Sequence, residues 1–299
     1  MAHSISSSLE WARAPHPLAT IAARLSFADA CLSRFVVPAV RIPSDNPVPE
    51  VAATAESGVE SSGRLQLRLV ADLHLFSRRS RAEEYLPSIR TAAGEADLFV
   101  LAGDTFDYKW AYQRCAESFA DHARDWLANL AGERPSCRFQ FILGNHDHHP
   151  ALISRLGELS AQLPNFSWDP WFLRHGSAIF LHGDVANGFV TSERLAKFRE
   201  RCKQHKRRPG AVQGRIYDAL IAARIHTCSA GVMFPPRRVA RRITRYLDHI
   251  GHGSGAGTRD VFFGHTHRPL NGFEHGGMRF HNPGAPIKGT QFRILKAEI

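Results

Sequence analysis

The 299-residue sequence has little cysteine and no long hydrophobic run. Its five cysteines include no Cys-x-x-Cys pair, which argues against a disulfide framework or a zinc knuckle and indicates a reducing compartment. No apolar segment approaches the roughly 20 residues that span a bilayer. The N-terminus also lacks the basic start and apolar stretch of a secretory signal. We therefore expect a cytoplasmic protein, with peripheral contact at the inner face of the membrane left open.

The composition is that of a globular protein with one atypical end. Apolar residues make up 43% of the chain and charged residues 22%, which supports a sizeable core. The stretch from Pro43 to Gly63 is instead rich in Pro, Ser, Glu, Ala and Val without a clear period, as is typical of a linker. We expect a poorly ordered N-terminal arm at residues 1–63 and one domain at residues 64–299.

Short apolar runs alternate with helical patterns from Leu65 onward. Leu65, Leu67 and Leu69 alternate with polar residues, as in a half-buried strand. Further apolar runs follow at 98–101, 139–143, 178–181 and 261–263. Helical patterns lie at 81–93, 112–130 and 151–163. Strands that alternate with helices predict a layered α/β fold.

Each apolar run ends in residues that can bind a metal ion. The clusters are Asp72-Leu73-His74, Gly103 to Asp107, Gly144 to Asp147, His182 to Asp184, and Gly264 to His267. Open α/β sheets place ligand sites at the carboxyl ends of their strands, so we expect these clusters to share one rim. Each motif alone is weak evidence, but their ordered succession predicts a metal site.

The types of ligand indicate the chemistry of that site. Carboxylate, amide and imidazole ligands without thiolates favour a divalent ion such as Mn, with Fe, Zn or Ni as alternatives, over structural zinc. The candidate ligands are Asp72, His74, Asp104, Asn145, His182, His265 and His267. These are too many for one ion, whereas two ions that share a carboxylate would use them all. Paired ions about 3.5–4 Å apart clamp the oxygens of an in-line displacement and lower the pKa of bound water. We therefore expect a phosphoesterase that uses a metal-held hydroxide.

The blocks D-x-H, G-D-x-x-D, G-N-H-D, H-G and G-H-x-H, in this order from Asp72 to His267, resemble the calcineurin-like metallophosphoesterase superfamily. The resemblance implies a four-layer α/β/β/α sandwich with a helical insert. It also implies two divalent metal ions, bridged by Asp104 and by a hydroxide nucleophile. One ion would be held by Asp72, His74, Asp104 and His267, and the other by Asp104, Asn145, His182 and His265.

The resemblance assigns a catalytic role to His146 as well as to Asp104. His146 would lie near the leaving group and either protonate the departing oxygen or stabilise the phosphoryl charge. Three further carboxylates are candidates to orient the ligand histidines, with turn capping or solvation as the alternative: Asp107, Asp147 and Asp184.

Some residues resemble one branch of the superfamily, the UDP-2,3-diacylglucosamine pyrophosphatases. They are Ala71 to Leu75, Gly264 to Pro269 (GHTHRP) and Asn282-Pro283-Gly284. Members of that branch carry a helical insert that caps the active site and holds an acylated substrate, and we expect the insert at about residues 187–258. His146 stands where those enzymes typically have Arg. The substrate is therefore open: a small or lipid-linked phosphorylated molecule, UDP-2,3-diacylglucosamine of lipid A synthesis itself, or the substrate of a nuclease or cyclic nucleotide phosphodiesterase.

The basic charge of the chain is concentrated in the expected insert. Residues 191–250 contain 15 of the 38 Lys and Arg residues but only 4 of the 28 Asp and Glu residues. A basic face favours an anionic partner. The alternatives are contact with substrate phosphates, docking on an anionic membrane, and a solvated face. Nucleic acid is less favoured because the segment has few aromatic residues for base stacking.

Overall fold

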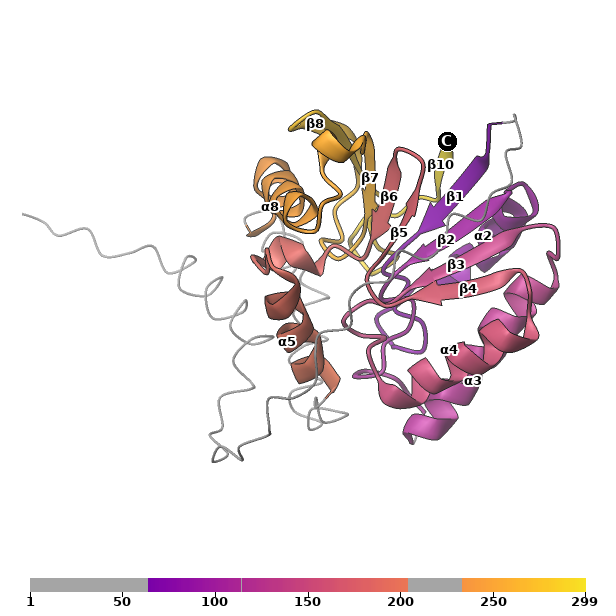
Figure 1. The fold of residues 1–299 in the computed structure, drawn as a ribbon. Helices are drawn as coiled ribbons and strands as arrows, with labels where there is room; N and C mark the ends of the chain where they lie inside the picture. Colours follow the sequence, from indigo (N-terminus) through magenta and orange to yellow (C-terminus); the bar gives the residue numbers. More distant parts are fainter. Residues whose placement is uncertain (1–63, 114, 204–232) are drawn as a thin grey trace, which may run out of the picture. The chain divides into compact units, whose positions relative to one another are not determined.

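The computed structural model describes residues 64–113, 115–203 and 233–299, all within the compact unit Ser62–Ile299 (Figure 1). The predicted N-terminal arm and the middle of the predicted insert lie outside these residues. The limits of the arm and of the insert therefore stay predictions.

The first sheet carries three of the five predicted metal-binding loops. Its strand order is β10-β1-β2-β3-β4, with β1 to β4 parallel and β10 antiparallel to β1. Val70 pairs with Leu101, and Leu101 with Phe141, so the loops after β1, β2 and β3 leave one edge of the sheet together. The strands are β1 Gln66–Val70, β2 Leu98–Ala102, β3 Arg138–Ile142, β4 Phe166–Asp169 and β10 Leu295–Glu298.

The second sheet carries the other two loops. Its order is β5-β6-β7-β9-β8, with β6, β7 and β9 parallel and antiparallel strands at both edges. Leu181 pairs with Phe263, so the loops after β6 and β7 also emerge side by side. The strands are β5 Phe172–His175, β6 Ala178–Leu181, β7 Asp260–Phe263, β8 Leu270–His275 and β9 Met278–Asn282.

One apolar cluster draws its side chains from both sheets. Leu67 and Leu69 of β1 belong to this cluster together with Phe180 and Phe262 of the second sheet, whereas Val70 belongs to the cluster under the helices. This division follows the two-residue side-chain period of a strand. All residues of β2 are buried, as expected for a parallel strand covered on both faces.

Helices cover the outer face of each sheet. On the first sheet these are α2 Leu86–Gly94, α3 Ala116–Gly132 and α4 Pro150–Gln162 (Figure 1). On the second sheet α5 Ser192–Lys203 and α8 Pro236–His249 pack through Leu195, Val239 and Ile243. Short 3-10 turns complete the elements: η1 Ala82–Tyr85, η2 Asp184–Asn187 and η3 Ser254–Ala256. The predicted four-layer α/β/β/α sandwich is confirmed.

The helix predicted at 112–130 begins four residues later than expected, at Ala116. Before it, the backbone N–H of Tyr112 donates to the carbonyl of Phe76 at 3.1 Å and is therefore committed to a loop contact. The Sγ of Cys115 accepts from the N–H of Ser118 at 3.4 Å and caps the helix. None of the described helices is long and apolar enough to cross a bilayer.

Candidate metal centre

The five strand-end loops meet and place their acidic and imidazole side chains within reach of common ions. Three overlapping groups have one potential ligand atom per residue within 4.8 Å of one another. The groups are Asp72, His74 and His267; His74, Asp104 and His146; and Asp104, His182 and His265. All the acidic and histidine ligands predicted from the sequence are thus brought together, and His146 joins them.

The first group combines the loop after β1 with the loop after β7. The Nε2 atoms of His74 and His267 lie 3.1 Å apart, and Nε2 of His267 lies 3.5 Å from Oδ1 of Asp72. Two imidazole nitrogens and a carboxylate oxygen therefore point into one small volume.

The group of Asp104, His182 and His265, with Asn145 beside it, combines the loops after β2, β3, β6 and β7. Nε2 of His182 lies 3.4 Å from Oδ2 of Asp104 and 3.2 Å from both Oδ1 of Asn145 and Nδ1 of His265. The predicted ligand Asn145 therefore belongs to this group through its amide oxygen. Asp104 occurs in this group and in the one with His74 and His146, which places its carboxylate at the junction of the site.

The donor set fits divalent cations. Oδ1 of Asp72 is buried without a hydrogen-bond partner among the described residues, whereas its Oδ2 accepts from the N–H of His265 at 2.7 Å. A buried carboxylate oxygen without a partner is costly, and a cation at this point would satisfy it. Oxygen and imidazole donors without a thiolate suit a catalytic ion such as Mn or Zn.

Backbone strain is concentrated at the same residues. Asp72, His74 and Asp104 have φ values of 53°, 48° and 48°, and His265 and His267 have 65° and 54°. Left-handed conformations are unfavourable for residues with a side chain, and such strain tends to collect at functional sites.

The glycines of the motifs make room for these side chains. A Cβ on Gly144 would lie 2.1 Å from Oδ1 of Asp104, and one on Gly264 would lie 2.5 Å from Oδ2 of Asp72. These positions therefore require glycine because of the close approach of the aspartate side chains.

The electrostatics of the site favour the cation-binding forms of Asp104, His74 and His265, but not of His182. Burial opposes the ionised form of Asp104, but His182 and His146 outweigh it and hold the pKa of Asp104 well below its usual range. Burial lowers the pKa of His74 to about 4 and, with the charge of His182, that of His265 to about 4. The Asp104 carboxylate overcomes the effect of burial and raises the pKa of His182 to about 10. A metal ion would displace that proton.

Asp107 contacts two histidines of the site. Its Oδ1 lies 2.8 Å from Nδ1 of His146, and its Oδ2 lies 3.5 Å from Nδ1 of His74. Burial opposes a charge on His146, but Asp107 and Asp104 outweigh it and raise the pKa of His146. The side chain of His146 is 21% exposed, so it is accessible to a substrate.

The other two candidate carboxylates have different partners. Asp147 accepts from the backbone N–H groups of Thr105, Phe106 and Gly144 at 2.9–3.2 Å and thereby fixes two of the loops. Asp184 is bound to Arg199 of α5. The expected histidine contact is therefore observed for Asp107, whereas Asp147 is a turn cap, which was the alternative, and Asp184 is half of an ion pair.

The sequence motifs predicted no role for three residues that lie around the site. Arg79 donates to Asp107, and Nδ2 of Asn187 lies 2.9 Å from Nε2 of His265. Asn282 donates to the carbonyl of Gly264 at 2.7 Å and accepts from the N–H of Gly284 at 2.8 Å. The Asn-Pro-Gly sequence is the one signal that could have indicated such a role, because Asn commonly fixes turns.

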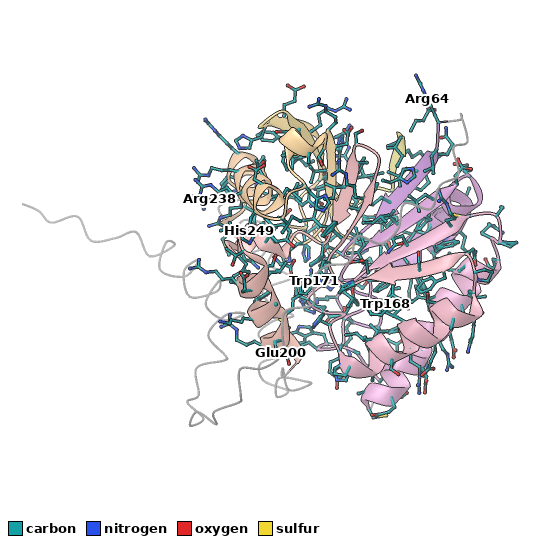
Figure 2. All side chains as sticks on the ribbon, viewed as in Figure 1. Arg64, Trp168, Trp171, Glu200, Arg238 and His249 are labelled. Carbon is teal, nitrogen blue, oxygen red and sulfur yellow. The ribbon has the colours of Figure 1, made fainter. Side chains whose placement is uncertain are left out.

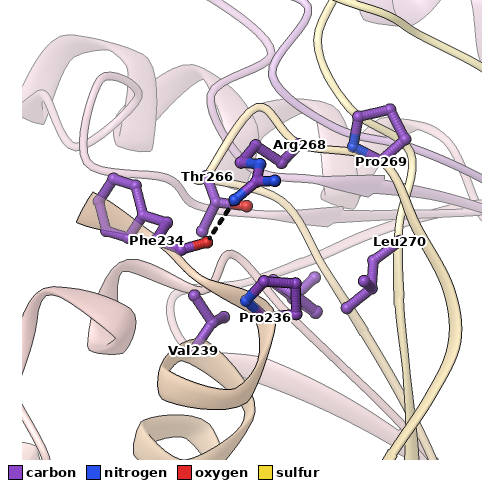
Figure 3. A pocket seen from close by; sticks show the side chains of 8 residues that line it. Phe234, Pro236, Val239, Thr266, Arg268, Pro269 and Leu270 are labelled. Atoms are coloured by element: carbon purple, nitrogen blue, oxygen red, sulfur yellow. Dashed lines mark hydrogen bonds between the residues drawn. The ribbon is translucent and has the colours of Figure 1, made fainter. Parts of the chain in front are cut away.

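An apolar notch lies next to the loop that carries His265 and His267. Phe234 and Val239 line one side, and Pro269 and Leu270 the other (Figure 3). Nη1 of Arg268 donates to the carbonyl of Phe234 at 3.0 Å, and the ring centroids of Phe234 and His265 lie 5.9 Å apart. The start of α8 is thus tied to the metal-binding loop.

The basic character predicted for the insert is found on α8. Arg237, Arg238, Arg241 and Arg245 are exposed, and Arg238 points outward from the helix (Figure 2). The apolar residues of α8 are buried in the protein. The outer face of the helix therefore offers positive charge and no apolar surface of its own.

Comparison with known proteins agrees with this site. Residues 66–269 match the calcineurin-like phosphoesterase family, and the chain belongs to that family. It is a phosphoester hydrolase, and membership implies metal-dependent hydrolysis at a dimetal centre.

Solved structures with a similar course of the chain include a dimetal phosphatase from Danio rerio. Its sequence is 13% identical to this chain, and the TM-score is 0.41. The alignment covers 78% of this chain and 95% of the phosphatase chain. A second solved structure is 10% identical in sequence, with a TM-score of 0.39. That alignment covers 79% of this chain and 99% of the other. A comparison with curated proteins gave no match.

Proposed function

We propose that the chain binds two divalent ions, Mn foremost, and hydrolyses a phosphate ester or anhydride bond. The ligands would be the seven predicted from the sequence: Asp72, His74 and His267 for one ion, Asn145, His182 and His265 for the other, and Asp104 for both. The observation that carries the proposal is the position of Asp104 in two of three overlapping ligand groups.

Each part of the site has a role in this reaction. The ions would supply a hydroxide at neutral pH and positive charge for the phosphoryl oxygens. His146, held by Asp107 at Nδ1, has Nε2 left to donate a proton to the departing oxygen. Hydrolysis would form a bond from a water-derived oxygen to phosphorus and break the bond from phosphorus to the leaving oxygen, and His146 would give its proton to that leaving oxygen.

The surroundings support an anionic substrate with an apolar part. The exposed arginines of α8 attract phosphate groups, and the notch beside His265 offers apolar contact. Both features agree with a small or lipid-linked phosphorylated molecule, and UDP-2,3-diacylglucosamine is a specific candidate. The proposed helical insert spans about residues 187–258.

The same arginines give a reason to test membrane contact. Because the apolar face of α8 is buried, this helix would bind an anionic membrane by charge alone. Such binding would weaken as ionic strength rises.

A hydrolysis screen with added Mn tests the proposal. The substrates are UDP-2,3-diacylglucosamine, nucleoside diphosphate sugars, cyclic nucleotides, aryl phosphates and single-stranded DNA. Mn-dependent turnover of a phosphate ester or anhydride by the wild-type chain supports the proposal. No turnover by folded, metal-loaded protein would contradict it, and preference for DNA would favour the nuclease alternative.

A further inference from the structure

Arg79 and Asp107 form a largely buried ion pair at the edge of the site. Nε and Nη2 of Arg79 both donate to Oδ2 of Asp107, at 3.2 and 2.5 Å. The Asp107 side chain is fully buried, and that of Arg79 is 11% exposed. Arg79 lies outside the five sequence motifs.

The two oxygens of Asp107 serve different partners. Oδ1 faces Nδ1 of His146 at 2.8 Å and accepts from the N–H of Trp110 at 3.3 Å. Oδ2 receives Arg79 and lies 3.5 Å from Nδ1 of His74. Arg79 and the N–H of Trp110 therefore both restrict rotation of the carboxylate about its Cβ–Cγ bond, and that rotation determines where Oδ1 meets His146.

The loop that holds Arg79 is joined to the loop that holds Asp107. Ser77 pairs with Ala111 in an isolated bridge, and the guanidinium carbon of Arg79 lies 5.3 Å from the centroid of the Trp110 ring. A cation over an aromatic face is attracted to it. The bridge between the loops and the Trp110 ring thus both restrict the position of Arg79.

We propose that Arg79 is a positioning residue for hydrolysis, acting through Asp107 to hold the His146 ring in the orientation that delivers its proton to the leaving oxygen. This inference rests on the proposed function. The proton moves from Nε2 of His146 to the leaving oxygen, which takes the electron pair of the broken bond to phosphorus. Neither Asp107 nor Arg79 takes part in the transfer itself.

The contact between Arg79 and Asp107 depends on the planar guanidinium group of arginine. Two adjacent N–H groups reach one carboxylate oxygen, whereas the ammonium of lysine is a point charge without a fixed direction. Lysine at this position would keep the charge beside Asp107 but lose part of the orientation.

The test compares kcat and KM for two aryl phosphate diesters that differ in the leaving group. One releases 4-nitrophenolate, which departs readily without a proton, and the other releases the more basic phenolate. We expect Arg79→Met to lower kcat for the phenolate ester by about 10–100-fold, to lower it less for the 4-nitrophenolate ester, and to change KM little. Arg79→Lys should recover part of the loss.

The controls separate positioning from folding and from the proposed function. Arg78→Met changes the exposed neighbouring residue and should match the wild type. The double variant Arg79→Met, His146→Ala should be no slower than His146→Ala alone, because residues that act as a unit are not additive. Equal losses on both esters, or additive effects in the double variant, would overturn the inference. A wild-type chain inactive on both esters would instead contradict the proposed function.

Discussion

Arg199 of α5 donates two hydrogen bonds to Asp184, at 2.8 and 3.0 Å, and both side chains are 1% exposed. Asp184 lies two residues after the candidate ligand His182. Arg199 also donates to the carbonyl of Pro170 and stacks 4.8 Å from the ring centroid of Trp171. A single arginine of α5 thus contacts both the loop after β6, which carries the candidate ligand His182, and the segment before β5.

Removing that arginine leaves a buried carboxylate without its cation. We expect Arg199→Met to destabilise the fold by about 3–5 kcal/mol, the usual cost of breaking a buried ion pair. Denaturant unfolding measures the change. Arg201→Met, on the exposed side of the same helix, should lie within about 0.5 kcal/mol of the wild type. Similar stabilities for both variants would show that the pair contributes no stability to the fold.

A substitution at Gly144 tests whether Asp104 depends on the close packing around it. Alanine there would bring its Cβ to 2.1 Å from Oδ1 and 2.2 Å from the backbone nitrogen of Asp104. We expect Gly144→Ala to displace Asp104 and to lose both metal binding and activity. Gly157→Ala is the matched control, because its Cβ meets nothing within 4 Å and a helix gains about 0.5–1 kcal/mol from alanine. Full activity of Gly144→Ala would show that Asp104 does not need its present position.

His146 has two possible roles that a substitution distinguishes. If it donates a proton, His146→Ala should keep both ions and lose about 10²–10⁴-fold in rate. The structure also groups it with His74 and Asp104 as a possible ligand. Metal analysis of the purified variant, alongside its kcat, decides between them. An emptied metal site would make His146 a ligand and refute the proton-donor assignment.

Local patterns in the sequence predicted a layered α/β fold and the convergence of the candidate ligands, and the family resemblance implied the four-layer arrangement. Apolar runs ending in Asp, Asn and His determine where strands stop, and parallel strands bring their ends to one edge. The partners of the buried carboxylates were not predictable in this way. Asp184 and Asp147 resemble Asp107 in the sequence, yet one meets Arg199 and the other meets backbone N–H groups. Such contacts depend on tertiary packing, which spacing along the chain does not encode.

The partner of Arg79 was likewise not predictable from the sequence. It stands beside Arg78 in a short basic pair, and neither residue carries a signal that one is exposed and the other is paired with a buried carboxylate. The pairing of the loops at Ser77 and Ala111, together with the contact with the Trp110 ring, gives Arg79 its position.

The metal content of the wild-type chain and of Asp104→Ala tests the central claim most directly. We predict two divalent ions per wild-type chain after loading with Mn, together with Mn-dependent hydrolysis of an aryl phosphate diester. Asp104→Ala should bind one ion or none and lose that activity. An Asp104→Ala variant that keeps both ions and the wild-type rate would contradict the account.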